Sequence, residues 1–232
     1  MKIMSFNTQH CLNFLEQKID YEIMAKAILD VGADVVGLNE MFDGGENVKY
    51  DYQTKKLSEL TGIENYYFAK AIDDWDGPYG NGLLSKIPFK SVETIKIPDP
   101  NPKRVEGGYY ETRCVLKAKL ENGYTVLVTH FGLCVDEQEN AVKTILEHIE
   151  NEKCIVMGDF NVTPDNEILD PIRARLKDTS VGFCDGKPSF PSDKPNIKID
   201  YIFVSHDIEV ISSDIANIIA SDHRPHIAEV KI

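Results

Sequence analysis

The sequence lacks the features that mark several large classes of protein. No apolar run approaches the roughly 20 residues that a transmembrane helix needs. The N-terminal stretch MKIMSFNTQH has neither the apolar region nor the cleavage site of a secretory signal. The five cysteines are widely scattered and include no Cys-x-x-Cys pair, so the sequence predicts neither a zinc site nor a disulfide framework. We therefore expect a cytoplasmic protein without a membrane span.

Positive charge is also scarce. The 232 residues include 25 Lys and Arg against 38 Asp and Glu, which gives a formal net charge of −13 at pH 7. Such a charge argues against a general electrostatic attraction to nucleic acid or to an anionic membrane. Residues 86–119 are nevertheless locally cationic. Most of these basic side chains are expected on solvated faces, but one or two of them could contact a phosphate.

The hydrophobic pattern predicts many short strands with a few helices between them. Hydrophobic residues make up 42% of the chain, enough for a sizeable core in one domain spanning residues 1–232. Asn122-Gly123, a dipeptide that favours a type I′ turn, joins the strands expected at 113–120 and 124–131 into a hairpin. Further strands are expected at residues 2–7, 33–40, 91–97, 154–161, 197–205 and 226–232 and within 77–89, with helices at 16–30, 50–61, 137–149 and from Thr163-Pro164 onward.

This order of elements indicates hairpins rather than regular βαβ units. The polar, glycine-containing stretch 41–55 between a strand and a helix is expected to be a mobile loop. The economical architecture for such a chain is a pair of mixed sheets packed face to face with helices outside them. The sequence therefore predicts an α/β sandwich.

One stretch, IVMGDFN at residues 155–161, ends a strongly apolar run with Asp159 and Asn161. Because alternate side chains of an extended chain point to the same side, these two polar groups are aimed at one place. Other apolar strands also contain an isolated polar residue or are followed by one. Burying such a polar group without a partner is costly. Each alone is compatible with a structural hydrogen bond, whereas convergence on one site explains them all. They are Asn7, Glu40, His130, Asp200, Asp222 and His223.

The composition of this set suggests its chemistry. Carboxylate and amide oxygens without a cysteine ligand suit a hard cation such as Mg²⁺ or Mn²⁺. Histidines in the same place can supply general acid–base catalysis near neutral pH. A metal ion, an activated water and an imidazolium together are suited to the hydrolysis of a phosphate ester.

The same residues occur in an order that resembles the signature of the endonuclease/exonuclease/phosphatase superfamily. This superfamily includes DNase I, exonuclease III, neutral sphingomyelinases and inositol-polyphosphate 5-phosphatases. The resemblance implies a four-layer α/β sandwich of the DNase I type, in the compact form of bacterial metal-dependent hydrolases. It rests on Asn7, Glu40, Thr129-His130, Gly158-Asp159-Phe160-Asn161, Ile199-Asp200-Tyr201 and Ser221-Asp222-His223.

The resemblance implies a role for each of these residues. Glu40 would be the principal ligand of Mg²⁺, with Mn²⁺ as an alternative, and Asn7 and Asp222 would complete the metal shell. Asp159 would position or deprotonate the attacking water. Asn161 would donate a hydrogen bond to a phosphoryl oxygen.

The histidines have further implied roles. His223, oriented by Asp200, would act as the base on the attacking water or as an imidazolium that stabilises the phosphate. His130 is typical of the branch that contains DNase I, sphingomyelinases and many phosphatases, and it would protonate the leaving oxygen. In DNase I a glutamate orients that histidine, whereas this chain has Tyr79-Gly80-Asn81-Gly82 there. Asn81 is the substitute that we expect.

Three further residues are implicated in substrate binding. Arg113 matches a family arginine that approaches the phosphate, with an exposed strand arginine as the alternative interpretation. Tyr79 and Trp75 would stack on a ring of the substrate unless they only pack locally.

The leading interpretation is a Mg²⁺- or Mn²⁺-dependent phosphoesterase acting on a small phosphodiester or phosphomonoester. The alternatives are a DNase I-like endonuclease acting on DNA and a non-catalytic binding scaffold with the same fold. An abasic-site endonuclease is disfavoured because FNTQHC replaces the pattern that those enzymes carry after the first asparagine. No protein partner is evident.

Overall fold

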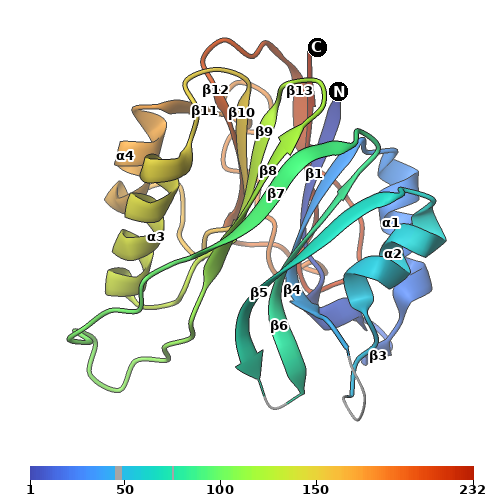
Figure 1. Cartoon of the computed structure of the whole chain (residues 1–232), viewed down its shortest axis with the longest axis horizontal. Coiled ribbons are helices and arrows are strands. Elements are labelled where there is room, and N and C mark those ends of the chain that lie inside the picture. Colours follow the sequence, from blue (N-terminus) through green and yellow to red (C-terminus); the bar gives the residue numbers. More distant parts are fainter. Residues whose placement is uncertain (45–48, 75) are drawn as a thin grey trace.

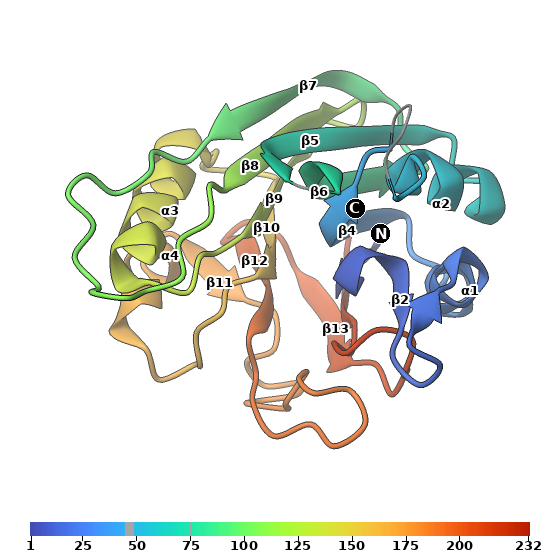
Figure 2. The ribbon, with the colours of Figure 1, turned by 90° about the horizontal axis from the view of Figure 1, so that it is seen from below.

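In a computed structural model, which describes residues 1–44, 49–74 and 76–232, two β-sheets lie face to face with helices on their outer faces (Figures 1 and 2). The first sheet has the order β13 (Val210–Ile215), β14 (His226–Val230), β1 (Lys2–Asn7), β4 (Val35–Phe42), β6 (Gly77–Ser85) and β5 (Asn65–Asp74). The second has the order β11 (Leu176–Asp178), β12 (Asp200–Ser205), β10 (Cys154–Asp159), β9 (Thr125–His130), β8 (Cys114–Leu120) and β7 (Phe89–Lys96).

The helices form the two outer layers. The first sheet is covered by α1 (Tyr21–Val31) and α2 (Gln53–Thr61), and the second by α3 (Val135–His148) and α4 (Asp170–Arg173). Two short 3₁₀ segments, η1 (Gln9–Cys11) and η2 (Glu167–Leu169), and a small sheet of β2 (Leu12–Asn13) and β3 (Lys18–Ile19) complete the elements. None of the helices in the described ranges is long and apolar enough to cross a bilayer.

Apolar residues on both faces of the central strands build the layers. Val126 and Val128 of β9 point into the core between the two sheets, whereas Leu127 points outward to the core under α3. Because successive strand residues face opposite sides, a strand buried on both faces needs the continuous apolar run that the sequence shows. A third core lies between the first sheet and α1. These layers confirm the predicted four-layer α/β sandwich.

Two predicted helices differ in their starts. The helix expected from residue 16 begins only at Tyr21, because the Asp20 side chain accepts a hydrogen bond from the Ile23 backbone amide and caps it there. The prediction of a helix start at Thr163-Pro164 is wrong. The Thr163 hydroxyl donates to the Asp165 carboxylate, and the next 3₁₀ segment is capped by Asn166 instead.

The hairpin of β8 and β9 is confirmed, but its turn differs from the type I′ prediction. The Leu120 amide donates to the Tyr124 carbonyl, so three residues form the loop. Gly123 alone in this loop has a positive φ, of 88°. A type I′ turn would require positive φ at Asn122 as well.

Strands β5 and β13 were not expected from the sequence. Both lie at the edges of the first sheet, where four of the ten residues of β5 and three of the six residues of β13 are exposed and the apolar pattern is weak. Strand β4 also runs past Glu40 to Phe42, and Asp43 then pairs with Tyr52. Part of the predicted loop 41–55 is therefore ordered pairing, while residues 45–48 lie outside the described residues.

Candidate active site

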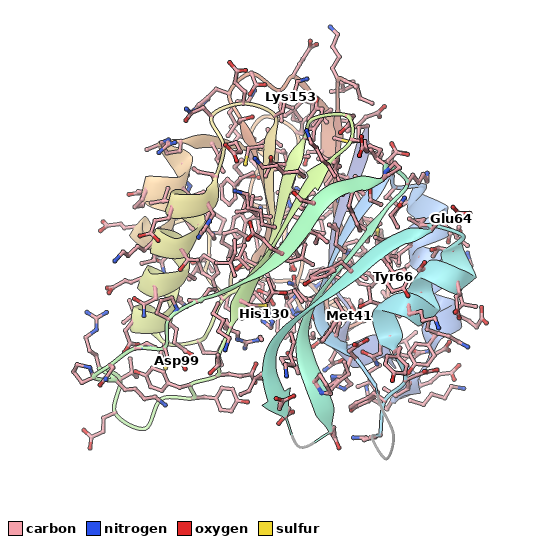
Figure 3. The ribbon with its side chains drawn as sticks, in the orientation of Figure 1. Met41, Glu64, Tyr66, Asp99, His130 and Lys153 are labelled. Atoms are coloured by element: carbon pink, nitrogen blue, oxygen red, sulfur yellow. The ribbon has the colours of Figure 1, made fainter. Side chains whose placement is uncertain are left out.

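The strand order brings the polar strand ends to one edge of the sandwich. Each sheet contains one parallel pair, β1 with β4 and β9 with β10. The carboxyl ends of parallel strands meet at the same edge, which places Asn7 beside Asn39 in the first sheet and His130 beside Asp159 in the second. Strand β12 runs antiparallel to β10 and begins at this edge with Asp200. Figure 3 shows His130 at the end of the sheets opposite Lys153.

Two buried asparagines connect the sheets at this edge. The Asn7 Nδ2 group donates to Glu40 Oε1 and to Asp159 Oδ2, both at 3.0 Å. Asn39 accepts a hydrogen bond from the Asp159 backbone amide at 3.0 Å and donates to the Thr129 carbonyl at 2.8 Å. Buried amides that satisfy partners in both sheets fix the distance between the two parallel pairs.

Two site residues have left-handed backbone conformations. Glu40 has a φ of 58° and lies where the register of β4 shifts against β6. Asn161 has a φ of 52°, and its backbone amide donates to Asp159 Oδ1 at 2.9 Å. Non-glycine residues with positive φ are uncommon and concentrate at functional sites, because the surrounding structure must compensate their cost.

Gly158 allows β10 to approach β9 just before Asp159. A Cβ atom at this position would lie 1.8 Å from the Thr129 carbonyl oxygen, and the φ of 151° is itself unfavourable for other residues. The glycine of the GDFN motif is therefore required for the spacing of the strands that hold His130 and Asp159.

We expect Gly158→Ala to lower the free energy of unfolding by about 3 kcal/mol or more, since backbone atoms cannot move aside as a flexible side chain can. Thermal and urea unfolding would measure it. Gly62→Ala is the matched control, because Gly62 has a φ of 70° but open space around its Cβ position. That control should cost only about 1–2 kcal/mol. Equal losses in the two variants would show that the close approach at Gly158 is unimportant.

A hydrogen bond to Asp200 and a close ionic contact with Asp159 hold His223 between the two carboxylates. His223 Nδ1 donates to Asp200 Oδ2 at 2.9 Å, and Ser189 donates to the same oxygen at 2.6 Å. This bond fixes the imidazole so that Nε2 faces Asp159 Oδ2 at 3.6 Å. The ring of Phe190 packs against the imidazole, with centroids 4.8 Å apart. His223 is therefore held in one orientation, with its reactive nitrogen at Asp159.

Burial and charge perturb these groups strongly. Burial raises the pKa of Asp159, and the nearby His223 opposes this rise. Burial lowers the pKa of His223, but the charges of Asp200 and Asp159 outweigh burial and raise it above its ordinary value. Burial likewise raises the pKa of Glu40, although its hydrogen bond from Asn7 acts in the opposite direction. Such coupled shifts are typical of sites that move protons.

His130 lies in the same place but has different partners. Its Nδ1 contacts Arg113 Nη1 at 2.8 Å, and its Nε2 lies 3.2 Å from Asn161 Nδ2 and 3.7 Å from Asp159 Oδ2. Burial lowers the pKa of His130 well below its ordinary value, and the charges of Arg113 and His223 lower it further. The expected partner Asn81 does not reach this ring.

Most of the predicted site residues line one cavity of about 470 Å³. Asn7 and Asp200 stand directly behind it through their hydrogen bonds to Glu40 and His223. Asn81 lies away from the cavity in the interface between the sheets, where it bonds Asn39 and the Cys114 carbonyl. Trp75 lies outside the described residues. The predicted residues that line the cavity are Glu40, Tyr79, Arg113, His130, Asp159, Asn161, Asp222 and His223.

Some lining and supporting residues were not found by sequence reasoning. Glu111, Tyr109 and Leu133 line the cavity, and Ser189 supports Asp200 from behind. A usable signal existed for Glu111, because it precedes Arg113 by two positions in an extended segment and so shares its side. The other three lie in irregular segments without a periodic signal.

The donor set fits a divalent cation. In the described ranges Glu40 accepts one hydrogen bond, at Oε1 from Asn7, so Oε2 has no hydrogen-bond partner there, and Glu40 lines the cavity. Asp222 lines the same cavity, and its charge adds to the burial that disfavours an ionised Glu40. Two neighbouring, partly buried carboxylates without a compensating cation are costly, and hard oxygen donors are what Mg²⁺ and Mn²⁺ prefer.

A second arrangement of potential ligands overlaps the first. Asp159, Asp200 and His223 offer ligand atoms within 4.8 Å of one another. In this group, however, His223 already bridges the two carboxylates through its own ring nitrogens. The ring therefore occupies the space between Asp159 Oδ2 and Asp200 Oδ2, which suits this group better to proton transfer, although Asp200 Oδ1 has no hydrogen-bond partner among the described residues.

Comparisons with known proteins agree with this geometry. The sequence profile described as "Endonuclease/Exonuclease/phosphatase family" matches residues 4–117 and 135–223. A search of curated proteins gave no significant match.

Solved structures share the fold at low sequence identity. An endonuclease/exonuclease/phosphatase from Beutenbergia cavernae superposes with a TM-score of 0.84 and 20% identity, over 100% of this chain and 71% of that chain. A mannosyl-6-phosphatase from Bacteroides thetaiotaomicron gives 0.79 and 17% over 100% of both chains. The human Nocturnin catalytic domain with bound sulfate gives 0.72 and 17% over 100% of this chain and 94% of that chain. The chain belongs to the Endonuclease/Exonuclease/phosphatase family.

Proposed function

We propose that the protein is a Mg²⁺- or Mn²⁺-dependent phosphoesterase that hydrolyses small phosphoesters. One observation carries the proposal: Asp159 lies within 4 Å of both His130 and His223, beside a carboxylate pair suited to a cation, in one cavity. Acid–base groups and metal-binding oxygens around one point are what attack of water on a phosphate requires.

The residues would divide the work as follows. Asp159, whose pKa burial raises toward neutrality, would accept the proton of the attacking water. His223, held by Asp200, would stabilise the phosphoryl oxygens as an imidazolium. Asn161 would keep its link to the Phe131 carbonyl and donate its remaining amide hydrogen to the phosphate. Arg113 retains a buried Nε group with no hydrogen-bond partner in the described part of the chain, so it has an unused donor.

Glu40 and Asp222 would hold the metal ion, with Asn7 fixing Glu40 from behind. When bound, a divalent cation polarises a phosphoryl oxygen and offsets developing negative charge. Asn7 would then serve mainly as a positioning group, because its Oδ1 accepts a hydrogen bond from the Gln9 amide and its Nδ2 contacts the carboxylates.

The walls of the cavity favour a small substrate. Tyr79, Tyr109, Leu133 and Phe190 surround the charged groups, and the volume of about 470 Å³ is within the usual range for small-molecule sites. The mannosyl-6-phosphatase neighbour acts, by its name, on a small phosphomonoester. A substrate of this size class is our first choice for the present chain.

DNA is the weaker alternative because half of the eight basic side chains of the stretch 86–119 contact carboxylates in the following pairs. Lys86 pairs with Asp34, Lys117 and Lys119 pair with Glu150, and Arg104 pairs with Glu139. Paired lysines and arginines release fewer counterions on binding a phosphate backbone.

The five cysteines are free thiols, which suits the reducing cytoplasm that we also propose. We retain residues 1–232 as one proposed domain.

The test is turnover of a phosphoester panel by the purified protein with and without Mg²⁺. We expect hydrolysis of small esters such as bis(p-nitrophenyl) phosphate and sugar phosphates, and its loss on adding EDTA. Plasmid DNA would remain intact. Nicking of plasmid with no turnover of small esters would instead support the endonuclease. Equal inactivity of wild type and Asp159→Asn on every substrate would leave only the scaffold.

A further inference from the structure

The contact between Arg113 and His130 determines the protonation of the imidazole. Arg113 Nη1 lies 2.8 Å from His130 Nδ1, and a guanidinium can only donate hydrogen bonds. Nδ1 must therefore carry a lone pair, which leaves the ring neutral with its single proton on Nε2. A carboxylate at the same position would have the opposite effect, because it would accept from Nδ1–H and favour the cation.

Glu111 holds the guanidinium in place. Glu111 Oε1 lies 2.8 Å from Arg113 Nη1, and Oε2 accepts a hydrogen bond from the Tyr109 hydroxyl at 3.0 Å. The backbone amide of Glu111 donates to Glu137 Oε1 at 2.9 Å, which ties this segment to α3. The side chain of Arg113 is about 10% exposed, so water screens the pair little.

The proton on Nε2 points toward the centre of the site. The neighbouring Asn161 Nδ2 lies 3.2 Å from Nε2 and also donates to the Phe131 carbonyl at 2.9 Å, so it is a second donor that faces the ring. A neutral imidazole accepts at only one nitrogen, and the charged guanidinium at 2.8 Å from Nδ1 takes that place in preference to the neutral amide. Asp159 Oδ2 lies 3.7 Å away, beyond hydrogen-bond distance. In the described ranges, the charged groups near this ring are Arg113, Asp159 and His223. The N–H group is left facing the place where a phosphoryl oxygen would lie.

We propose that Glu111 and Arg113 are positioning residues that hold His130 as the neutral Nε2–H tautomer, so that His130 serves as a neutral hydrogen-bond donor rather than as a cationic acid. The identity of the acceptor as a phosphoryl or leaving oxygen rests on the function proposed above. His130 keeps its proton in this role. The leaving oxygen takes a proton from a solvent water, and the hydroxide so formed takes the proton that Asp159 accepted from the attacking water. The expected orienting residue Asn81 is replaced by Arg113, and the protonation state changes with it.

The tautomer can be measured without any substrate. We expect ¹⁵N spectra of the histidine side chains at pH 7 to show His130 with an unprotonated Nδ1 and a protonated Nε2, assigned by the signals that His130→Gln removes. In Arg113→Met the pKa of the same ring should rise, because one of the charges that lower it is removed while burial still acts. A cationic ring or a protonated Nδ1 in the wild type at pH 7 would overturn the proposal.

Activity separates a neutral donor from an acid. A glutamine amide can donate a hydrogen bond from nearly the position of Nε2 but cannot give up a proton. We therefore expect the kcat of His130→Gln to exceed that of His130→Ala by at least about tenfold, which is part of the effect of one hydrogen-bond donor to an oxyanion. Equal losses in both variants would argue for proton transfer. Arg113→Met should shift any acidic limb of the pH profile that depends on His130 to higher pH, because the variant removes one of the charges that lower the pKa of His130, and a purely structural role would not do so.

Glu111→Gln tests the second positioning residue against Glu121→Gln, an exposed glutamate in the β8–β9 turn. We expect Glu111→Gln to lower kcat with a smaller change in KM and to broaden the His130 ring signals, whereas Glu121→Gln leaves both unchanged. Unchanged signals in Glu111→Gln would remove it from the proposal. Hydrolysis by a protein with the wrong tautomer would refute only this inference, and the right tautomer without hydrolysis would refute only the proposed function.

Discussion

Asp159→Asn is expected to reduce kcat for small phosphoesters by about 10²–10⁴-fold, the usual contribution of a positioned acid–base group. The substitution keeps the shape of the side chain but removes the charge that faces both imidazoles. It also removes the group that would accept the proton of water. KM should change less, because Asn161 and Arg113, the residues that we propose to bind the phosphate, are retained.

The same variant should lose little stability. Burial raises the pKa of Asp159, which means that the folded state tolerates the ionised carboxylate poorly. A neutral amide relieves this cost and still accepts from the Asn161 backbone, but its Nδ2 then faces Asn7 Nδ2, which loses an acceptor. Because the two effects oppose each other, we expect a melting temperature close to that of the wild type.

Steady-state kinetics and thermal melts of the same preparation test both expectations. Asp193→Asn is the matched control, since Asp193 is exposed and outside the cavity. A loss of activity accompanied by a lower melting temperature would show that Asp159 acts by supporting the fold. Activity within about threefold of the wild type would exclude it as the base, because a base contributes at least about 10²-fold.

The edge where the polar strand ends converge was predictable from the sequence. Asp159 and Asn161 follow a run that is apolar on both faces, which identifies a central strand and the end at which it stops. Asn7 and His130 end such runs in the same way. Central strands of both sheets carry the strongest hydrophobic signal, so the residues at their ends are the ones that sequence reasoning places best.

The partners of His130 were not predictable, because they depend on a register of one residue. A two-residue turn at Asn122-Gly123 would place Val115 opposite His130, whereas the three-residue turn places Val115 opposite Thr129. A shift of one residue moves every side chain of the strand to the other face. The choice between the two turns depends on backbone geometry that the dipeptide alone does not determine.

Asn81 shows the same limit in β6. The motif around it suggested an orienting group for His130, but its contacts are with Asn39 and Cys114 in the interface between the sheets. Its neighbour Tyr79 reaches the cavity, past a shift in the register of β5 against β6. Such irregularities are fixed by long-range pairing and leave no mark on the local sequence pattern.

Glu40→Gln is expected to abolish the stabilisation of the protein by Mg²⁺ and to lower activity by at least about 10²-fold. The change removes the carboxylate of Glu40, which lines the cavity, while the amide oxygen can still accept the hydrogen bond from Asn7. A wild-type protein with Mg²⁺ at about 100 times its Kd should gain about 2.7 kcal/mol from binding. The variant should gain almost none of this.

In metal-free buffer the Glu40→Gln variant should be at least as stable as the wild type. Burial and the charge of Asp222 both raise the pKa of Glu40, so an ionised Glu40 without a cation destabilises the folded state. A neutral glutamine removes this repulsion. With EDTA present, we expect the melting temperature of the variant to equal or exceed that of the wild type.

Melting curves with EDTA and with a series of Mg²⁺ concentrations measure both effects. Glu64→Gln is the control, because Glu64 is exposed and lies far from His130 (Figure 3). It should respond to Mg²⁺ as the wild type does. A variant Glu40→Gln that melts much lower in EDTA would make Glu40 a structural residue, and an undiminished response to Mg²⁺ would place the cation elsewhere. If the response to Mg²⁺ is undiminished, Asp222 is the remaining carboxylate of the pair at the cavity, and Asp222→Asn would test whether it holds the cation.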